Sequence, residues 1–141
     1  TAGDGLMVIF QDEEPERHAR NAVQTALGIL RRTVVINEAG GIDEPIRLHV
    51  GVNSGPAAVG ATKIEGNAAT RWTYTASGAV TNVAARLAAL GAGDSAFIGP
   101  ETARRIEGWF DLEDLGVREL KNVEEPVRVY RLATSAASLA A

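Results

Sequence analysis

The segment TYTASGAVTNVAARLAAL (73–90) carries an amide and a guanidinium one helical turn apart. Its apolar residues recur at helical spacing and are expected to face a core: Val80, Val83, Ala84, Leu87 and Leu90. Asn82 and Arg86 stand at i and i+4 on the other side. A guanidinium offers fixed donors to phosphoryl oxygens and stabilises charge that develops in a transition state. A solvated helix face shows the same pair, and for this segment taken alone that is the better interpretation.

Other polar residues offer fewer candidates for chemistry. Asp4 lies in a GDG turn, and a carboxylate held in a tight turn suits a hard cation, although most such turns bind none. His18 and His49 are far apart and lack a second ligand at metal spacing, so we do not expect a zinc site. The acidic residues around Pro15 are those of an exposed helix N-terminus. Only Asp4 therefore remains as a metal-ligand candidate.

The composition indicates one globular domain. The 141 residues are 45% hydrophobic and 23% charged, a mixture that buries a core. The net charge of -4 argues against nucleic-acid and anionic-membrane partners. The absence of cysteine excludes disulfides and thiolate chemistry, and it fits a cytoplasmic location. No apolar run approaches the length of a membrane span, so we expect no membrane contact from this segment.

The first half of the chain contains one long helix between strands. After the GDG turn, residues 6–10 read as a buried strand. Pro15 and its acidic neighbours begin a helix that Gly40 and Gly41 end. Residues 47–52 alternate apolar and other side chains, which predicts a half-buried strand. Residues 56–62 are predicted to be its hairpin partner.

The second half predicts a mixed sheet with packed helices. A polar, flexible segment (63–72) leads to a short strand (73–76) and the helix with Asn82 and Arg86. A strand at 95–99, a helix at 100–108 and an antiparallel pair at 109–120 and 127–133 follow. The fold class is therefore α+β, a ferredoxin-like arrangement. We place the domain at 1–133 and expect residues 134–141 to be a flexible tail.

The order of these motifs resembles that of the class III adenylate/guanylate cyclase catalytic domain. The chain runs GDGLMVIF, a long Ala-rich helix, RLHVGVNSGPAAVG, TYTASGAVTNVAARL, IGPETARRI and LGVRELKNVEEPVRVYRL, with gaps similar to those of the family. The spacing T-x-x-G-x-x-x-N-x-x-x-R agrees at every functional position. The resemblance covers nearly the whole chain.

The resemblance implies a role for five residues. Asn82 would orient the ribose, and Arg86 would stabilise negative charge on the α-phosphate. Thr75 falls at the position that contacts the purine, where a hydroxyl alone distinguishes adenine from guanine only weakly. Lys121 falls at the position that contacts the triphosphate. Asp4 matches the second of two aspartates that hold a pair of Mg²⁺ or Mn²⁺ ions. Such a pair polarises the α-phosphate, activates the ribose 3′-hydroxyl and neutralises the pyrophosphate.

The resemblance also implies that the chain is N-terminally incomplete. The first metal aspartate and a purine-reading lysine would both stand upstream of Thr1, so we expect a piece of a longer protein that has little activity alone. Three smaller departures from the family lie within the chain. Asn53 stands where the family often has His, Ala79 where it often has an acidic or amide residue, and Asn122, beside Lys121, where it often has Gly.

The leading hypothesis is an adenylate cyclase that converts ATP to 3′,5′-cyclic AMP and pyrophosphate in cyclic nucleotide signalling. The resemblance implies a head-to-tail homodimer, in which one protomer supplies the metal aspartates and the other supplies Thr75, Asn82, Arg86 and Lys121. Two alternatives stay open. One is a guanylate cyclase, and the other is a non-catalytic cyclase-like module that dimerises or binds nucleotide for regulation.

Overall fold

The computed structural model describes residues 5–65, 70–91 and 94–133, with the backbone alone described for 62–65 and 70–75. The elements are α1 (Pro15–Ala39), β1 (His49–Val52), β2 (Ala58–Glu65), β3 (Thr70–Ser77), α2 (Ala79–Ala89), β4 (Ser95–Ile98), α3 (Pro100–Arg105), β5 (Leu112–Arg118) and β6 (Val127–Leu132). The main sheet has the order β1-β4-β6-β5. β1 and β4 are parallel and the other pairs antiparallel. The expected α+β class with a mixed sheet is confirmed.

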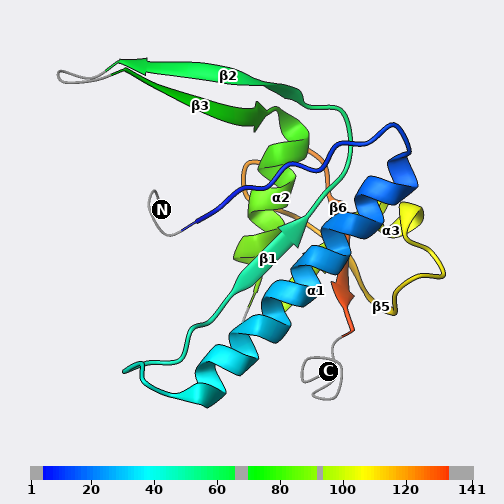
Figure 1. The fold of residues 1–141 in the computed structure, drawn as a ribbon. Coiled ribbons are helices and arrows are strands. Elements are labelled where there is room, and N and C mark those ends of the chain that lie inside the picture. The colour runs from blue at the N-terminus through cyan, green and yellow to red at the C-terminus, as the bar shows by residue number, and fades with distance from the viewer. Residues whose placement is uncertain (1–4, 66–69, 92–93, 134–141) are drawn as a thin grey trace.

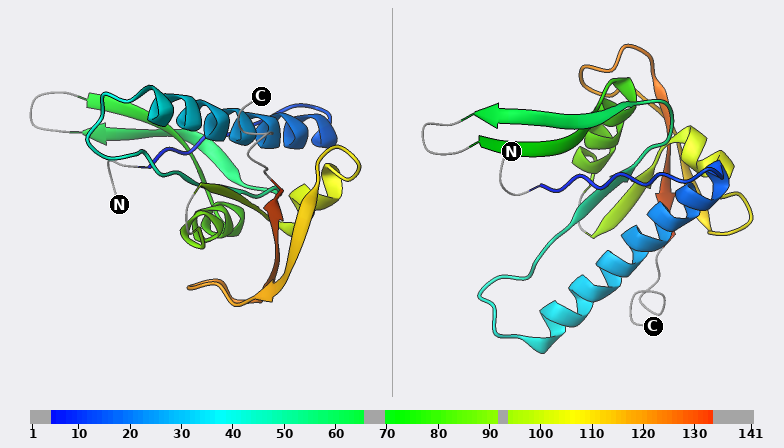
Figure 2. Two further views of the ribbon diagram at one scale, coloured as in Figure 1. Left: turned by 90° about the horizontal axis from the view of Figure 1, so that it is seen from below. Right: turned by 45° about the horizontal axis from the view of Figure 1, so that its top comes forward.

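Two buried clusters lie on opposite faces of this sheet (Figures 1 and 2). On one face, Ala96 and Ile98 of β4 pack against the apolar stripe of α1 and against α3. On the other face, Phe97 packs with Leu87 of α2. Neighbouring side chains in a strand point to opposite faces, so β4 contributes to both clusters. The sheet is therefore covered by helices on both sides.

The long helix α1 begins and ends where the sequence predicts. Glu14 is extended at the N-cap and Pro15 is the first helical residue, where a missing amide proton costs nothing. The helix stops before Gly40 and Gly41, which have φ of 75° and 86°. These left-handed values suit glycine and end the helix. The buried residues form one stripe: Ala19, Val23, Ala26, Leu27, Leu30 and Thr33.

The predicted strand at residues 6–10 is wrong. Residues 5–12 have no strand structure, and the exposed fraction of Leu6 is 89%. A strand is stabilised by a ladder of backbone hydrogen bonds to a neighbour, and none of the described strands pairs with this segment. The apolar composition of residues 6–10 therefore does not mark a buried strand within this chain.

The predicted hairpin between residues 47–52 and 56–62 is also wrong. β1 pairs in parallel with β4, with Val50 opposite Ala96. β2 pairs with β3 instead, and these two strands form a separate antiparallel sheet that projects from the body (Figure 1). β3 begins at Thr70, so part of the segment expected to be flexible is strand. The connection through Gly55, with φ of 152°, leads the chain away from β1.

The C-terminal elements agree with the sequence. The helix predicted at 100–108 is α3, which is shorter and has Pro100 in its first turn. The predicted strand pair is β5 and β6, with an irregularity between Asp114 and Val117. Residues 134–141, the expected tail, lie outside the described residues. Among the helices that the structure describes, none combines the length and apolar character needed to cross a membrane.

Candidate functional site

Helix α2 presents Asn82 and Arg86 on the side away from its buried residues. Leu87 is fully buried and Val83 packs beside it. Asn82 is exposed and Arg86 partly buried. In an α-helix a position and its i+4 neighbour lie one above the other, so the amide and the guanidinium form a short polar stripe. This arrangement can contact two adjacent groups of one ligand.

The strand β1 holds α2 at close range. A Cβ atom built on Gly51 would lie 2.1 Å from the carbonyl oxygen of Ala84 and 2.6 Å from the amide nitrogen of Ala88. Only glycine permits this approach, because both contacts are backbone atoms. The alternation in residues 47–52 predicts a strand that is covered on one side only, whereas the side that carries Gly51 also has a helix against it. Here α2 covers the strand.

A glycine also joins β3 to α2. Gly78 has φ of 118°, which other residues rarely adopt, and its carbonyl oxygen accepts the amide proton of Asn82 at 3.1 Å. The backbone of Thr75 lies in β3 opposite Gly60, shortly before this junction. Nothing is described of the Thr75 side chain. Thr75, Asn82 and Arg86 therefore lie on one continuous strand–helix unit.

The turn between β5 and β6 places Lys121 on the α2 side of the sheet. Leu120 is buried in the same cluster as Leu87 of α2, and Lys121 is exposed. Asn122 adopts the left-handed conformation with φ of 62°, which Asn tolerates better than most residues and Gly best. Asn122 therefore supplies the turn in which the family often has Gly.

The described residues do not supply a metal site by themselves. Asp4, the predicted ligand, lies outside them. Within 5–65, 70–91 and 94–133, no group of three His, Asp or Glu side chains could hold a metal ion. Without Asp4, the described residues therefore do not hold a pair of metal ions, and no chemical step is derived through one.

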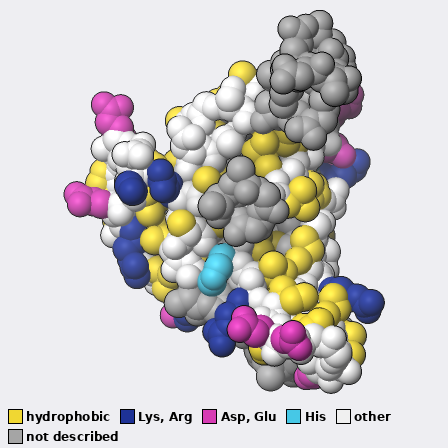
Figure 3. Space-filling model, turned by 90° about the vertical axis from the view of Figure 1, so that its left-hand side faces the viewer, with side chains coloured by type: hydrophobic (Ala, Val, Ile, Leu, Met, Phe, Trp, Pro, Cys, Tyr) yellow, Lys and Arg dark blue, Asp and Glu magenta, His cyan; other side chains and the backbone are white. Residues whose placement is uncertain are grey.

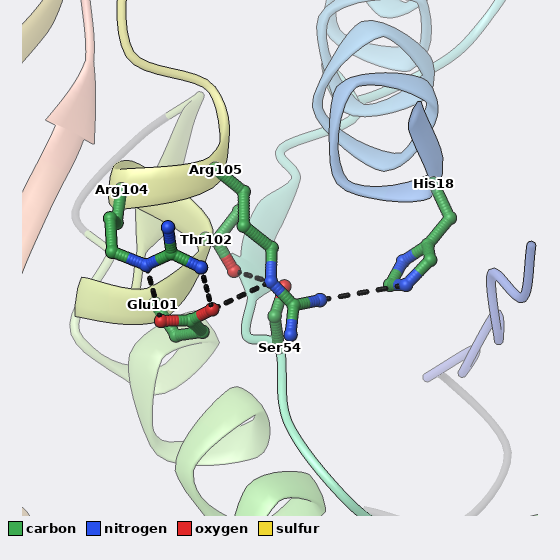
Figure 4. Close-up of polar contacts among 6 residues, drawn as sticks. All are labelled: His18, Ser54, Glu101, Thr102, Arg104 and Arg105. Carbon is green, nitrogen blue, oxygen red and sulfur yellow. Dashed lines mark hydrogen bonds and ion pairs between the residues drawn. The ribbon is translucent and has the colours of Figure 1, made fainter. Parts of the chain in front are cut away.

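A second polar cluster joins α1, α3 and the end of β1 (Figure 4). Arg104 and Arg105 both donate to the Glu101 carboxylate, at 2.7–2.9 Å. These hydrogen bonds, the one from Arg104 foremost, lower the pKa of Glu101 from 4.5 to about 2. His18 contacts Arg105 at 3.5 Å. The Glu101 carboxylate is engaged by two guanidinium groups of its own helix, so these ion pairs stabilise α3 itself, while His18 and Ser54 connect α3 to α1 and β1.

Asn53 and Ser54, the two residues that follow β1, were not predicted as part of the site. Ser54 and the fully buried Thr102 share a hydrogen bond at 2.7 Å, which ties the end of β1 to α3. The Asn53 amide donates to the carbonyl oxygen of Val80 in α2 at 3.1 Å. The sequence gives one indication, because Asn53 stands where the family often has His. It does not predict that the Asn53 side chain contacts Val80.

Residues 1–134 match the family model described as the adenylate and guanylate cyclase catalytic domain. No curated protein sequence matches the chain significantly. Several solved structures are similar in fold. The adenylyl cyclase CyaB from P. aeruginosa shares 25% identity with a TM-score of 0.77, and the match covers 92% of this chain and 67% of that one.

Two guanylate cyclase domain structures are also similar. The guanylate cyclase domain of RhGC from Catenaria anguillulae, in complex with GTP, shares 26% identity with a TM-score of 0.68, and the match covers 94% of this chain and 63% of that one. The non-canonical dimeric guanylyl cyclase domain of the RhoGC fusion protein from Blastocladiella emersonii shares 21% identity with a TM-score of 0.62, covering 93% and 62%. The chain thus spans 62–67% of the lengths of these three.

Proposed function

Because the chain belongs to the adenylate and guanylate cyclase catalytic domain family, we propose that it converts ATP to 3′,5′-cyclic AMP and pyrophosphate. One observation carries this proposal. Asn82 and Arg86 lie one turn apart on the side of α2 away from Leu87, and α2 is fixed on the sheet by backbone contact with Gly51. A site that stabilises a transition state needs such preorganised donors on a rigid element.

In the proposed reaction, the ribose 3′-oxygen attacks the α-phosphorus. The new bond joins the 3′-oxygen to phosphorus, the bond to the β-phosphate oxygen breaks, and the hydroxyl proton leaves to solvent. Arg86 donates to the α-phosphate oxygens as negative charge grows there. Asn82 hydrogen-bonds the ribose and holds the 3′-oxygen in line, which supplies the orientation that an intramolecular attack needs. Lys121 binds the outer phosphates as a point charge.

We propose that Thr75 contributes to the choice between adenine and guanine. Its hydroxyl can accept from the adenine amino group or donate to the guanine carbonyl, so other contacts must assist it. A guanylate cyclase is the second candidate, because the Catenaria relative, at 26% identity, was solved with GTP. Measuring the rate of product formation from ATP and from GTP distinguishes an adenylate cyclase from a guanylate cyclase.

We propose Mg²⁺ or Mn²⁺ as cofactor, with Asp4 as one ligand. This part of the proposal rests on the family resemblance and on the chemistry of a carboxylate in a tight turn. It makes no use of the described residues, which hold no group of three suitable side chains. We also propose a cytoplasmic location, where ATP and a reducing environment suit a cysteine-free chain.

We further propose a head-to-tail homodimer. The projecting β2–β3 arm is a two-stranded sheet, a structure that is only marginally stable alone in water. Leu6, Met7 and Val8 expose apolar surface. Figure 3 shows hydrophobic side chains gathered on the face that lies to the left in Figure 1. Apolar surface of this kind marks an interface, and a second copy of the chain would cover it.

The test is product analysis with the full-length protein. The protein is incubated with Mn²⁺ and either ATP or GTP, and the products are separated by mass. We expect cyclic AMP and pyrophosphate in equal amounts, faster than cyclic GMP, and much less product from the 141 residues alone. Faster formation of cyclic GMP would favour the guanylate cyclase. Nucleotide binding without any cyclic product would support a regulatory module instead.

A further inference from the structure

We infer that Asn53 is a positioning residue for the proposed reaction, because its side-chain amide fixes the first turn of α2 and thereby places Asn82 and Arg86. This inference rests on the function proposed above. Asn53 follows β1 directly, and its Nδ2 donates to the carbonyl oxygen of Val80 at 3.1 Å. Val80 is the second residue of α2.

The Asn53 side chain is confined between α2 and the start of α3. A Cβ atom on Gly99 would lie 2.1 Å from Oδ1 of Asn53, so the absence of a side chain at Gly99 makes room for the amide. The backbone there is fixed as well, because the Gly99 amide donates to the carbonyl oxygen of Val52 at 2.9 Å. An amide in this space has few alternative rotamers, which makes its hydrogen bond a precise restraint on α2.

The contact complements the close approach at Gly51. Gly51 meets the middle and the last turn of α2, at Ala84 and Ala88, and Asn53 meets its first turn at Val80. With Asn53, the contacts that restrain α2 extend from its first turn to its last. Asn82 lies two residues after Val80, within the turn that Asn53 holds. Loss of the Asn53 amide therefore shifts Asn82 and Arg86 without removing either.

The control is the neighbouring residue Ser54. Its hydroxyl bonds Thr102 of α3 at 2.7 Å and makes the equivalent connection to the other helix. Asn53→Ala and Ser54→Ala each remove one side-chain hydrogen bond at the end of β1, so both are expected to lower stability by a similar amount. Only Asn53→Ala is expected to affect α2. Asn53→Asp keeps the shape of the side chain and removes the donor, which provides a second variant.

The test measures kcat, KM and hydrogen exchange of the α2 amides in the full-length protein. We expect Asn53→Ala and Asn53→Asp to lower kcat about tenfold or more, because small misplacement of a catalytic group is costly, while KM changes by less than about threefold. In a background that carries Asn82→Ala and Arg86→Ala together, Asn53→Ala should lower kcat by less than about threefold, because Asn53 acts through these two residues and the effects of coupled residues are not additive. Exchange in the first turn of α2 should accelerate in both Asn53 variants and stay unchanged in Ser54→Ala.

Several results would overturn the inference. These are wild-type kcat in both Asn53 variants, an equal loss of kcat in the background that lacks both Asn82 and Arg86, unchanged exchange in α2, or a failure of both variants to fold. A wild-type protein that forms no cyclic nucleotide would contradict the proposed function instead. In that case the exchange of α2 alone decides whether Asn53 positions this helix.

Discussion

Gly51 lies directly beneath Ala84, so that the backbone of α2 rests on the backbone of β1. A Cβ atom at Gly51 would approach the Ala84 carbonyl oxygen to 2.1 Å. Backbone atoms of a packed helix cannot move aside as the end of a flexible side chain can. The position of α2, and with it the proposed site, therefore depends on a residue that has no side chain.

Gly51→Ala is expected to destabilise the protein. The added methyl group forces α2 away from β1, and overpacking of this kind typically costs about 1–3 kcal/mol of the free energy of unfolding. Urea denaturation measures the change. The matched control is Gly28→Ala in α1, where an added Cβ meets nothing within 4 Å. That variant should gain about 0.5–1 kcal/mol, since Ala is the better helix former. Wild-type stability of Gly51→Ala would contradict the close contact.

Arg86→Ala is expected to lower kcat without unfolding the protein. Loss of one preorganised donor at a developing charge costs roughly 10²–10³ in kcat, and Lys121 still binds the triphosphate, so KM should change little. Steady-state kinetics and a melting curve measure the two effects. Arg32→Ala, on the exposed side of α1, serves as control and should keep wild-type kinetics. An effect on KM alone would make Arg86 a substrate-binding residue.

Thr75→Ala is expected to reduce the preference for ATP over GTP. A single hydroxyl at a purine edge contributes about 1 kcal/mol through its hydrogen bond, so the ratio of the two kcat/KM values should fall about fivefold. Competition between the two nucleotides measures this ratio directly. If it stays at the wild-type value, the purine is read elsewhere.

Glu101→Gln is expected to remove a pH-dependent part of the stability. The pKa of Glu101 is lowered from 4.5 to about 2 by Arg104 and Arg105. A lowered folded-state pKa stabilises the protein above pH 4.5, and the contribution is lost as the pH falls toward 2. The difference at pH 7 should stay below about 1 kcal/mol, since the pair is partly exposed to solvent.

Unfolding curves between pH 2 and 7 test this expectation. The free energy of unfolding of the wild type should converge on that of Glu101→Gln as the pH falls through this range. Glu107→Gln, at an exposed carboxylate beyond α3, is the control. A constant difference between wild type and Glu101→Gln across the range would show that these ion pairs within α3 do not stabilise the protein.

Local patterns in the sequence predicted the elements better than their pairing. The limits of α1 follow from Pro15 and from Gly40, because caps and breakers act within one turn of the chain. The parallel pairing of Val50 with Ala96 joins residues far apart in sequence, and no local signal encodes it. The apolar run at residues 6–10 failed as a strand prediction for a related reason, since a strand depends on a neighbouring backbone that periodicity cannot show.

The sequence predicts which residues form the proposed site, but it does not predict the contacts that hold their helix in place. The spacing of Asn82 and Arg86 alone places both on one face of a helix. Gly51 and Asn53 appeared as ordinary strand and loop residues, because their function lies in contacts with Ala84 and Val80. Such contacts depend on how α2 crosses β1, and this crossing is set by tertiary packing.

The most direct test of a site shared between two copies of the chain is to mix two inactive variants. Asp4→Ala and Arg86→Ala proteins are each assayed for cyclic AMP formation, then mixed, and the heterodimers are quantified by native mass spectrometry. In a head-to-tail dimer, one of the two sites in each heterodimer carries neither change, so random mixing should restore about a quarter of the wild-type activity. Heterodimers that form without any recovery of activity would contradict the shared site.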